Sequence, residues 1–321
     1  MTTWLLTGGA GYIGAHVIRE LLASGRNVVV LDDLSSGVRE NVPADVPFVE
    51  ASISDRAAVV AALRDHRVDG VIHLAAKKAA GESVDEPLYY FRENVDGMLA
   101  LLEAMDEAKV RRLVYSSSAA VYGTPAMNPI PEDAALTPES PYGETKVVGE
   151  WLARDCGVAQ GLSWVALRYF NVAGAGSDAL GDRSVNNLVP MVFRALQNGQ
   201  RPKVFGADYP TPDGTCIRDY IHVSDLANAH VAAAARCEAQ QCAEAFNVGR
   251  GRGSSVHEVM AMVSEVVGRE VDAEVVGRRA GDPPASFADT GKIKRELGWQ
   301  ARYDLRDMVT SAWSAWRAQH P

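Results

Sequence analysis

The stretch TWLLTGGAGYIG, residues 3–14, decides the fold that this sequence predicts. Thr3–Thr7 has the composition of a buried strand, and Gly8, Gly11 and Gly14 follow it and open a helix over Gly11–Ala23. Glycines at this spacing allow a tight turn and let the backbone approach a pyrophosphate. The N–H groups at the start of the helix then bind the phosphates. A strand, a glycine turn and a helix in this order predict a dinucleotide-binding site.

Further along the first half of the chain, short apolar strands alternate with helical segments. The predicted strands are Asn27–Asp32, Gly70–Ala75, Arg112–Ser117 and Ser163–Phe170, and the predicted helices lie near 55–66, 85–108 and 142–156. Strands this apolar, separated by helices, indicate a parallel sheet covered on both faces. We therefore expect an α/β fold with a doubly wound parallel sheet of the Rossmann type, whose ligands bind beyond the carboxyl ends of the strands.

Acidic residues at the end of the second strand favour NAD as the dinucleotide. Asp32 and Asp33 close that strand, and Asp32 lies eighteen positions beyond Gly14. A carboxylate there accepts hydrogen bonds from the adenosine ribose diol and repels the 2′-phosphate of NADP. The alternative is a surface turn capped by two acids.

The second half of the chain predicts a smaller, mixed α/β substrate lobe. Helical segments are expected near 186–198, 224–238, 254–267 and 303–318, between stretches rich in Gly, Pro and Asp. Phe246–Gly249 is apolar enough to return as a last strand of the main sheet. We expect a NAD-binding domain over residues 1–171 with a return segment at about 222–249, and a substrate lobe over the rest of 172–321.

Composition excludes several classes of function. The sum of 32 basic and 41 acidic residues gives a net charge of -9, which argues against binding to nucleic acid or to anionic membranes. The four cysteines form no C-x-x-C pair and no zinc spacing, so no metal site is predicted and a reducing compartment is favoured. The start of the chain lacks a signal peptide's basic region, and no apolar run approaches the ~20 residues of a membrane helix. We expect a soluble, cytoplasmic protein.

A tyrosine and a lysine four residues apart form the candidate catalytic pair. Ser140 and Pro141 are suited to a helix start, so Tyr142 and Lys146 share one helix face. Lowering a tyrosine pKa from roughly 10 to near 7 needs about 4 kcal/mol, which the lysine ammonium and a positive nicotinamide ring would supply. Tyr142 is then able to deprotonate an alcohol whose hydride leaves for NAD. The alternative is an exposed helix with a half-buried tyrosine.

Three serines follow the strand at 112–117 and add to this site. A hydroxyl at the carboxyl end of a parallel strand faces the ligand crevice. We expect Ser118 to hydrogen-bond the reacting oxygen and Ser116 to lie near the cofactor, whereas Ser117 is better explained as a turn cap.

Several longer motifs identify the chain as similar to the extended short-chain dehydrogenase/reductase family. They are TGGAGYIG, LAAKKAAGES, SSSAAVYG, SPYGETK, LRYFNVAGA, FGADYPTPDGTCIRDYIHV and RRAGD, which together span nearly the whole chain. Within the family, the chain resembles the members that epimerise UDP-hexoses at C4. The resemblance implies NAD held as a hydride carrier, a UDP-hexose substrate, and a homodimer formed through helices such as those at 85–108 and 142–156.

Related dehydratases carry an Asp-Glu pair after the active-site hydroxyl, because eliminating water needs a separate acid and base. Here Ala119 and Ala120 follow Ser118, which argues against elimination. The alternatives are another NAD-dependent sugar-nucleotide oxidoreductase or dehydratase, which consumes NAD or releases water, and a non-catalytic dinucleotide-sensing protein, which tolerates loss of Tyr142.

The resemblance also implies which residues contact the ligands. The cofactor contacts are Gly8, Gly11, Tyr12, Ile13, Gly14, Asp32, Asp33, Leu34, Ser35, Ser36, Gly37, Ser52, Ile53, Leu74, Ala75, Ala76, Lys78, Asn94, Ser116, Tyr142, Lys146 and Phe170. The substrate contacts are Lys78, Ser118, Tyr142, Tyr169, Asn171, Asn187, Leu188, Lys203, Phe205, Arg218, Tyr220, Arg279, Asp282 and Ser286.

For some of these positions, the chemistry of the side chain itself supports the proposed ligand contact, and for others an alternative contact remains. Arg218 and Arg279 suit a pyrophosphate because guanidinium groups bind it with two hydrogen bonds, and Phe205 suits stacking on uracil. An internal ion pair between Arg218 and Asp219 is the alternative. Which of Lys77 and Lys78 points inward stays open.

Two further positions bear on specificity. Ser52 stands where the family usually has an Asp that binds the adenine amine. Ser286 is small where some relatives carry a bulky aromatic residue, so we expect room for a 2-acetamido group and turnover of UDP-N-acetylhexosamines as well.

Overall fold

The structure of the protein, a computed structural model, describes residues 1–279 and 281–320 and divides into two compact units. Unit 1 comprises Met1–Val121, Pro138–Arg168 and Ala227–Phe246, and unit 2 comprises Tyr122–Thr137, Tyr169–Leu226 and Asn247–Pro321. Within the described residues, no helix is both long and apolar enough to cross a membrane.

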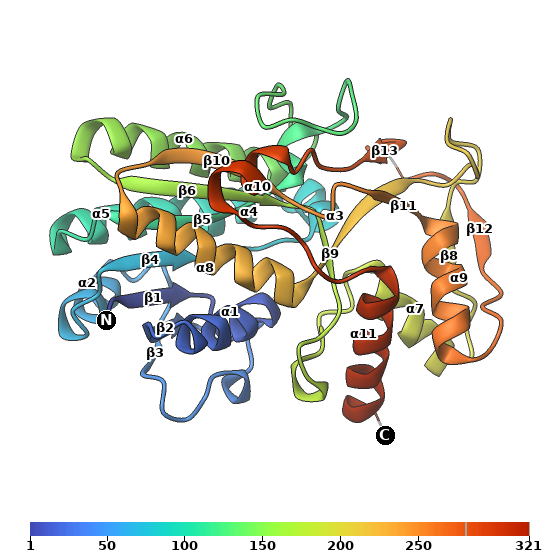
Figure 1. Cartoon of the computed structure of the whole chain (residues 1–321), viewed down its shortest axis with the longest axis horizontal. Helices are drawn as coiled ribbons and strands as arrows, with labels where there is room; N and C mark the ends of the chain where they lie inside the picture. The colour runs from blue at the N-terminus through green and yellow to red at the C-terminus, as the bar shows by residue number, and fades with distance from the viewer. Residues whose placement is uncertain (280, 321) are drawn as a thin grey trace. The chain divides into compact units, whose positions relative to one another are not determined.

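Unit 1 is built on a seven-stranded sheet with the order β10-β6-β5-β4-β1-β2-β3 (Figure 1). Its strands are β1 (Thr3–Thr7), β2 (Asn27–Asp32), β3 (Phe48–Glu50), β4 (Gly70–His73), β5 (Arg112–Ser118), β6 (Ser163–Tyr169) and β10 (Ala243–Val248). β1 pairs in parallel with both β2 and β4, so the chain changes direction across the sheet at β1. This is the switch point of a doubly wound fold, and the predicted fold class and the returning strand near Phe246 are confirmed.

The helices of this unit connect successive strands. They are α1 (Tyr12–Ala23), the short 3-10 turn η1 (Arg39–Asn41), α2 (Arg56–Asp65), α3 (Ala80–Asp85), α4 (Pro87–Phe91), the π-helical segment η2 (Arg92–Asp96), α5 (Gly97–Ala108), the 3-10 turn η3 (Ala119–Tyr122), α6 (Pro141–Gln160) and α8 (Val223–Ala239). The predicted continuous helix at 85–108 is therefore wrong in detail. Glu86, which precedes Pro87, has extended φ and a ψ of 54°, and this interrupts the helix because a residue before proline disfavours helical angles.

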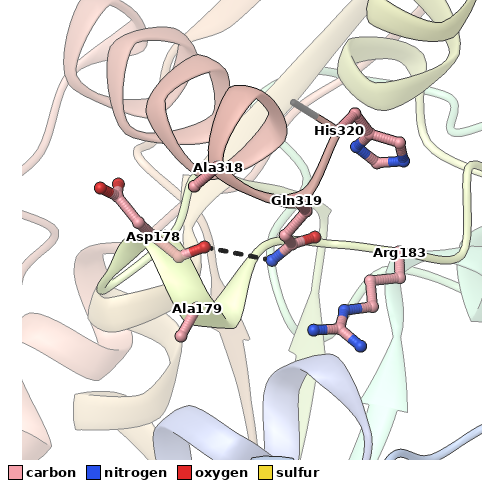
Figure 2. A pocket seen from close by; sticks show the side chains of 6 residues that line it. All are labelled: Asp178, Ala179, Arg183, Ala318, Gln319 and His320. Carbon is pink, nitrogen blue, oxygen red and sulfur yellow. Dashed lines mark hydrogen bonds between the residues drawn. The ribbon is translucent and has the colours of Figure 1, made fainter.

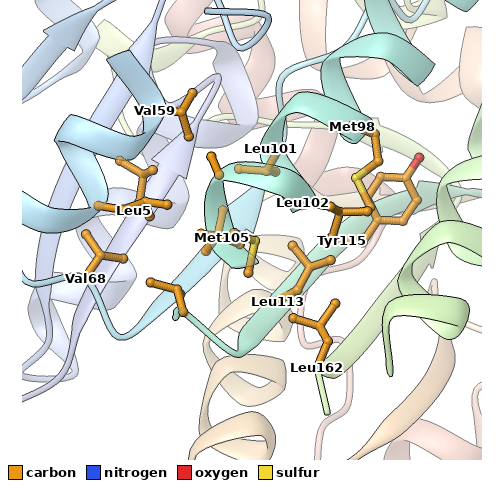
Figure 3. Packing of buried hydrophobic residues seen from close by; sticks show 14 of the residues in the cluster. Leu5, Val59, Val68, Met98, Leu101, Leu102, Met105, Leu113, Tyr115 and Leu162 are labelled. Carbon is orange, nitrogen blue, oxygen red and sulfur yellow. The ribbon is translucent and has the colours of Figure 1, made fainter. Parts of the chain in front are cut away.

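The two faces of the sheet are covered by different helices. Side chains alternate along a strand, so Leu5, Leu113 and Tyr115 point to one face, where they pack with buried residues of α2, α5 and α6 (Figure 3). Trp4 and Ser116 point to the other face and reach α8, since Trp4 Nε1 donates to Glu238 and Ser116 Oγ lies 2.9 Å from His230 Nε2. This double cover explains why the strands are apolar on both sides.

Unit 2 contains two small sheets and a helical layer. Its elements are β7 (Asn171–Ala173), η4 (Asp178–Leu180), α7 (Leu188–Gln197), β8 (Lys203–Phe205), β9 (Ile217–His222), β11 (Gly253–Ser255), α9 (Val256–Val267), β12 (Glu274–Val276), β13 (Ala285–Ser286), α10 (Gly291–Leu297) and α11 (Leu305–Gln319). β9 pairs with β11, β13 and β7, and β12 pairs with β8. α7, α9 and α11 close a separate core around Phe193, Val263 and Trp316.

Candidate active site

The glycine turn after β1 fits the pyrophosphate of a dinucleotide. Gly8 has a φ of +73°, and a Cβ on it would lie 2.6 Å from the Ala75 nitrogen. A Cβ on Gly14 would lie 2.6 Å from the Gly8 oxygen, so neither position accepts a larger residue without displacing backbone. Among the described residues no side chain caps Gly11 at the start of α1, so the helix N-terminus offers its N–H groups and positive dipole end to a phosphate.

The two acids at the end of β2 have different surroundings. Asp32 is buried, and its carboxylate accepts N–H bonds from Ala10 at 2.9 Å and Leu34 at 2.8 Å. Burial raises its pKa above the usual range. Asp33 is exposed, and although partial burial opposes the change, hydrogen bonds from Ser35 and the charge of Lys77 lower its pKa. Asp32 therefore shapes the loop, while Asp33 presents the accessible charge.

The loop after β4 contains the two candidate lysines. Lys77 directs its ammonium to Ser35 Oγ at 3.4 Å and over the ring of Tyr89 at 5.6 Å. Asn94 fixes the backbone of Lys77, because it accepts the Lys77 N–H at 2.8 Å and donates to the Lys77 carbonyl at 3.0 Å. The side chain of Lys78 is exposed. Lys77 is therefore the lysine that turns toward the end of β2.

Asn94, a predicted cofactor contact, is buried in the π-helical segment and also donates to Thr145 Oγ1 at 3.0 Å. It ties the loop after β4 to α6, so its amide groups serve the scaffold of the site. π-helical turns often occur at functional sites, where they re-aim a side chain.

The candidate catalytic pair lies at the start of α6, as the sequence predicts. Ser140 accepts the Gly143 N–H as the N-cap, and Ser83 Oγ accepts the Tyr142 N–H at 3.1 Å. The Lys146 ammonium donates to the Ser116 carbonyl at 2.9 Å and lies 5.9 Å from the centre of the Tyr142 ring. Tyr142, Lys146, Ser116 and Ser118 are all buried.

The electrostatics of this pair differ partly from expectation. Burial raises the pKa of Tyr142, although a hydrogen bond with Ser118 opposes this. Burial also lowers the pKa of Lys146 to about 8, against the charge of Glu150. The sequence predicts a lowered pKa for Tyr142, but in this geometry the chain's own groups raise that pKa instead. Lowering it requires a further positive charge near the phenol.

The sequence interpretation missed a buried ion pair that supports the lysine. Glu150 lies one helical turn beyond Lys146 and pairs with Arg168 through two bonds of 2.9 and 2.6 Å. Ser117 donates to the same carboxylate at 2.5 Å, which gives this serine a role other than the predicted turn cap. The spacing of four residues on α6 was the available signal for Glu150.

In unit 2, the Arg218 guanidinium binds Asp282 at 3.3 Å and donates to the Pro283 carbonyl at 2.7 Å. The alternative of an Arg218–Asp219 ion pair is wrong, because the Asp219 carboxylate accepts backbone N–H groups of Arg250, Gly251 and Ala288 instead. Two sites that the sequence assigns to the nucleotide, Arg218 and Asp282, are thus brought together.

Phe205 and Arg279 are also brought together. The Arg279 guanidinium lies 3.8 Å from the centre of the Phe205 ring, so it covers one face of the ring that the sequence assigns to uracil. Ser286 is buried and lies beside Arg218 in the register of β13 and β9. Asn187 precedes α7 and donates to Asp182 at 2.7 Å.

The remaining predicted contacts are distributed between the two units. In unit 1, the backbone N–H groups of Leu74 and Ala75 bond to the Thr7 carbonyl, and Ser52 Oγ accepts the Ser54 N–H at 3.2 Å, as in a turn. In unit 2, Tyr169, Phe170, Asn171 and Tyr220 lie on or beside β7 and β9, Leu188 begins α7, and Lys203 begins β8. Ser36, Gly37 and Ile53 lie in the loops that follow β2 and β3.

A cavity of about 640 Å³ in unit 2 lies apart from these assignments. It is lined by Asp178, Ala179, Arg183, Ala318, Gln319 and His320, and Gln319 donates to the Asp178 carbonyl across it (Figure 2). The sequence assigns none of these six residues to a ligand.

Comparisons with known proteins agree with this geometry. The family model described as the NAD dependent epimerase/dehydratase family matches residues 4–249. A UDP-glucose 4-epimerase from Azospirillum brasilense is 46% identical over 317 residues, which cover 97% of this chain and 91% of the relative.

Solved structures give the same result. The UDP-glucose-4-epimerase of Stenotrophomonas maltophila, crystallised with bound NAD and formylated UDP-arabinopyranose, is 42% identical with a TM-score of 0.95 over 99% of both chains. The UDP-Glc/GlcNAc 4-epimerase of Campylobacter jejuni is 36% identical with a TM-score of 0.87, again over 99% of both chains.

Proposed function

The chain belongs to the NAD-dependent epimerase/dehydratase family, and from that premise we propose that it is an isomerase that interconverts UDP-glucose and UDP-galactose by inverting C4 of the hexose. The observation that carries the proposal is the buried set of Tyr142, Lys146 and Ser118 beyond the ends of the parallel strands. That set moves a proton at a hydroxyl, which is the acid–base half of a hydride transfer.

The cofactor assigned to unit 1 is NAD, which supplies a hydride acceptor that later returns the same hydride. The glycine turn with Tyr12 and Ile13 would hold the pyrophosphate, and Asp33 would accept hydrogen bonds from the ribose hydroxyls. Lys146 anchors the other ribose, since its ammonium is already directed to the edge of the sheet by the Ser116 carbonyl. With NAD bound, the Tyr142 phenol would gain the additional positive charge nearby that it requires to lose its proton.

The roles of the catalytic residues follow from their geometry. Tyr142 takes the proton of the C4 hydroxyl as the hydride leaves, and Ser118 holds the reacting oxygen. After the 4-keto sugar has turned over in the site, Tyr142 would return the proton to the C4 oxygen. Net redox is zero, so the enzyme needs no second substrate.

Unit 2 is assigned the nucleotide part of the substrate. Arg218 and Arg279 bind the pyrophosphate, Phe205 stacks on uracil through the face that Arg279 does not cover, and Asn171, Asn187 and Asp282 offer polar contacts to phosphate, ribose or base. Firm binding of UDP with loose binding of the hexose is what an inversion requires, because the sugar has to present both faces.

The competing dehydratase reaction is disfavoured by two residues. Elimination of water needs an acid and a base besides the tyrosine. Ala119 and Ala120 occupy the turn after Ser118 and exchange no proton. A net oxidoreductase predicts stoichiometric consumption of added NAD, and a non-catalytic protein predicts no dependence on Tyr142.

The test is to incubate purified protein with UDP-galactose, with and without added NAD, and to measure UDP-glucose. We expect product without net change of NAD. In Tyr142→Phe the rate should fall by about 10²–10⁴-fold, the usual range for loss of a general acid–base group, while NAD binding persists. A Tyr142→Phe variant with unchanged turnover, or stoichiometric reduction of NAD, contradicts the proposal.

A second substrate class is supported by Ser286. This side chain is small and buried beside Arg218 in the sheet of unit 2, and one solved relative is described as acting on both UDP-Glc and UDP-GlcNAc. We propose that the chain also epimerises UDP-N-acetylglucosamine. Ser286→Tyr should lower that turnover at least about tenfold relative to UDP-galactose, since added bulk in a filled site costs at least 1–3 kcal/mol. An unchanged ratio removes the basis for this substrate.

We also propose that the protein is a cytoplasmic homodimer. Exposed apolar side chains gather on neighbouring helices of unit 1, where Val84, Leu88, Leu99, Trp151 and Val158 are exposed on α3, α4, α5 and α6. Such a group of side chains is typical of an interface that a second chain covers. Four free thiols support a reducing compartment.

A further inference from the structure

Two cysteines of unit 1 lie close enough to react with each other. The Sγ atom of Cys237, in the last turn of α8, is 3.6 Å from the Sγ atom of Cys242, directly before β10. Both are free thiols, and the proposed reaction uses neither sulfur. The pair lies where α8 turns into β10 (Figure 1), at the ends of the strands opposite to the glycine turn.

The surroundings of the pair favour a reactive sulfur. The contact with Cys237 lowers the pKa of Cys242 to about 7, although burial opposes this, and the same contact together with burial raises the pKa of Cys237. Ser163 Oγ lies 3.3 Å from the same sulfur and accepts the Cys242 N–H at 3.1 Å, which fixes its position. Thiolate is the form that attacks disulfides, so this pair differs from ordinary buried cysteines.

A cavity beside the pair is lined in part by Cys237, although Cys237 is only 3% exposed. Its volume is about 440 Å³, and besides Cys237 and Ser163 it is lined by the cations Lys109, Arg111 and Arg112 and by the acids Asp69 and Glu238, among others. Both acids are engaged, because Glu238 pairs with Arg26 at 2.6 Å and Asp69 accepts the Thr3 N–H at 2.9 Å. Arg111 and Lys109 both pair with Asp106, which lies outside the cavity lining, at 2.6 and 3.8 Å. The lining itself carries three cations against two acids, and this excess of positive charge favours an anionic ligand.

We propose that Cys237 and Cys242 are a reversible dithiol–disulfide pair, oxidised by an anionic low-molecular-weight disulfide that enters this cavity. The sulfurs need to approach by roughly 1.5 Å to reach the S–S bond length of about 2.05 Å.

The chemistry balances without any further reactant. Cys237 lines the cavity and is the protonated partner of the pair, so it passes its proton to the Cys242 thiolate as it attacks one sulfur of the external disulfide. The small thiolate that leaves takes this proton from Cys242 and departs as the first small thiol. Cys242 then attacks the Cys237 sulfur of the mixed disulfide and releases the second. Two protein S–H bonds and one external S–S bond are broken, and one protein S–S bond and two external S–H bonds are formed. The product bond ties the end of α8 to the start of β10.

The sequence makes the test direct, because residues 237–250 form a single tryptic peptide that contains both cysteines and no other. Reduced protein is incubated with oxidised glutathione as the probe, alkylated, digested and analysed by mass spectrometry. We expect this peptide to lose two hydrogens and to escape alkylation, while Cys156 remains alkylated. Reduction with dithiothreitol should restore both alkylated sites. Two alkylated thiols, or a mixed disulfide that persists on the native chain, overturn the proposal.

Variants assign the roles of the two sulfurs and of the cavity. Cys242→Ser should stop at a stable mixed disulfide on Cys237, and Cys156→Ser should behave like the native chain. Lys109→Gln should slow the reaction with oxidised glutathione roughly threefold or more through loss of attraction, whereas its matched control Lys294→Gln should not. Hydrogen peroxide at the same concentration should oxidise the pair more slowly. Equal rates with peroxide, or no effect of Lys109→Gln, contradict the proposed oxidant.

Discussion

Lys146 differs from an ordinary surface lysine because its ammonium is buried against the edge of the parallel sheet. Its Nζ donates to the Ser116 carbonyl at 2.9 Å, and Glu150 lies one turn further along α6. Burial lowers its pKa to about 8, so its charge is present at neutral pH and is lost as the pH rises through about 8. The charge that favours the Tyr142 phenolate therefore has an upper pH limit.

We accordingly expect kcat for epimerisation to fall as the pH rises above about 8. In Lys146→Arg the guanidinium stays protonated, so the decline should move to higher pH even if the maximal rate is lower. In Lys146→Met the rate should drop by about 10²–10⁴-fold at all pH values. The measurement is the pH dependence of kcat for the three proteins. Coincident alkaline limits in the native chain and Lys146→Arg would show that another group sets the decline.

The residues of the site were predictable to different degrees. Tyr142 and Lys146 share one helix and one face, so their spacing alone predicts that they meet. The bonds from Glu150 to Arg168 and Ser117 join α6 to two different strands, and no local pattern contains such long-range contacts. The contact of Arg279 with one face of the Phe205 ring was equally unpredictable. The sequence assigns both residues to one ligand, but it does not show how they lie relative to each other.

At the scale of elements, Glu238 anchors α8 to the first strand of the sheet. Its carboxylate accepts hydrogen bonds from Thr2 at 2.6 Å and Trp4 at 2.8 Å and pairs with Arg26 at 2.6 Å. Burial alone would raise its pKa, but the hydrogen bonds from Arg26, Thr2 and Trp4 outweigh it and lower the pKa to about 2. A depressed carboxylate pKa stabilises the fold above the unfolded value of about 4.3, and this contribution is lost as the pH falls toward the folded value.

Glu238→Gln should therefore lower the free energy of unfolding at neutral pH by about 1–3 kcal/mol, since a hydrogen-bonded charge pair that is mostly buried loses its charge. The difference from the native chain should vanish at acid pH. Urea denaturation at the two pH values measures both effects. Glu265→Gln is the matched control, because Glu265 pairs with Arg306 while about half exposed, and such surface pairs contribute little. Equal losses in the two variants would contradict the anchoring role.

The predictable elements are those with long periodic signals. The bounds of β1 and β2 agree with the sequence, and α9 and α11 begin at capping boxes in which Ser255 and Glu258, or Asp304 and Asp307, bond reciprocally. The strands β7 and β8 have three residues each, which is too short for an alternation of apolar and polar residues to be recognised in the sequence. They form through pairing with β9 and β12. Their existence depends on partners distant in the chain.

At the scale of the whole molecule, the proposed dimer depends on the exposed apolar group on α3 to α6. Trp151 is 48% exposed and Leu88 is 78% exposed, although both are large and apolar. Trp151 and Val158 are seven positions apart on α6, so they lie on the same helix face. A stable dimer covers about 800 Å² on each partner, and large aromatic side chains near the centre of such an interface carry most of its binding free energy.

We therefore expect the native chain to sediment as a dimer and Trp151→Asp to sediment as a monomer at micromolar concentration, because a carboxylate on each subunit would be desolvated on association. Met127→Asp is the matched control, since Met127 is also an exposed apolar residue, at 62%, but belongs to unit 2. It should leave the sedimentation coefficient unchanged. Sedimentation velocity with circular dichroism as a check of folding makes the comparison. A native chain that sediments as a monomer, or a Trp151→Asp variant that stays dimeric, contradicts an interface on these helices, whereas dissociation of Met127→Asp alone would move the interface to unit 2.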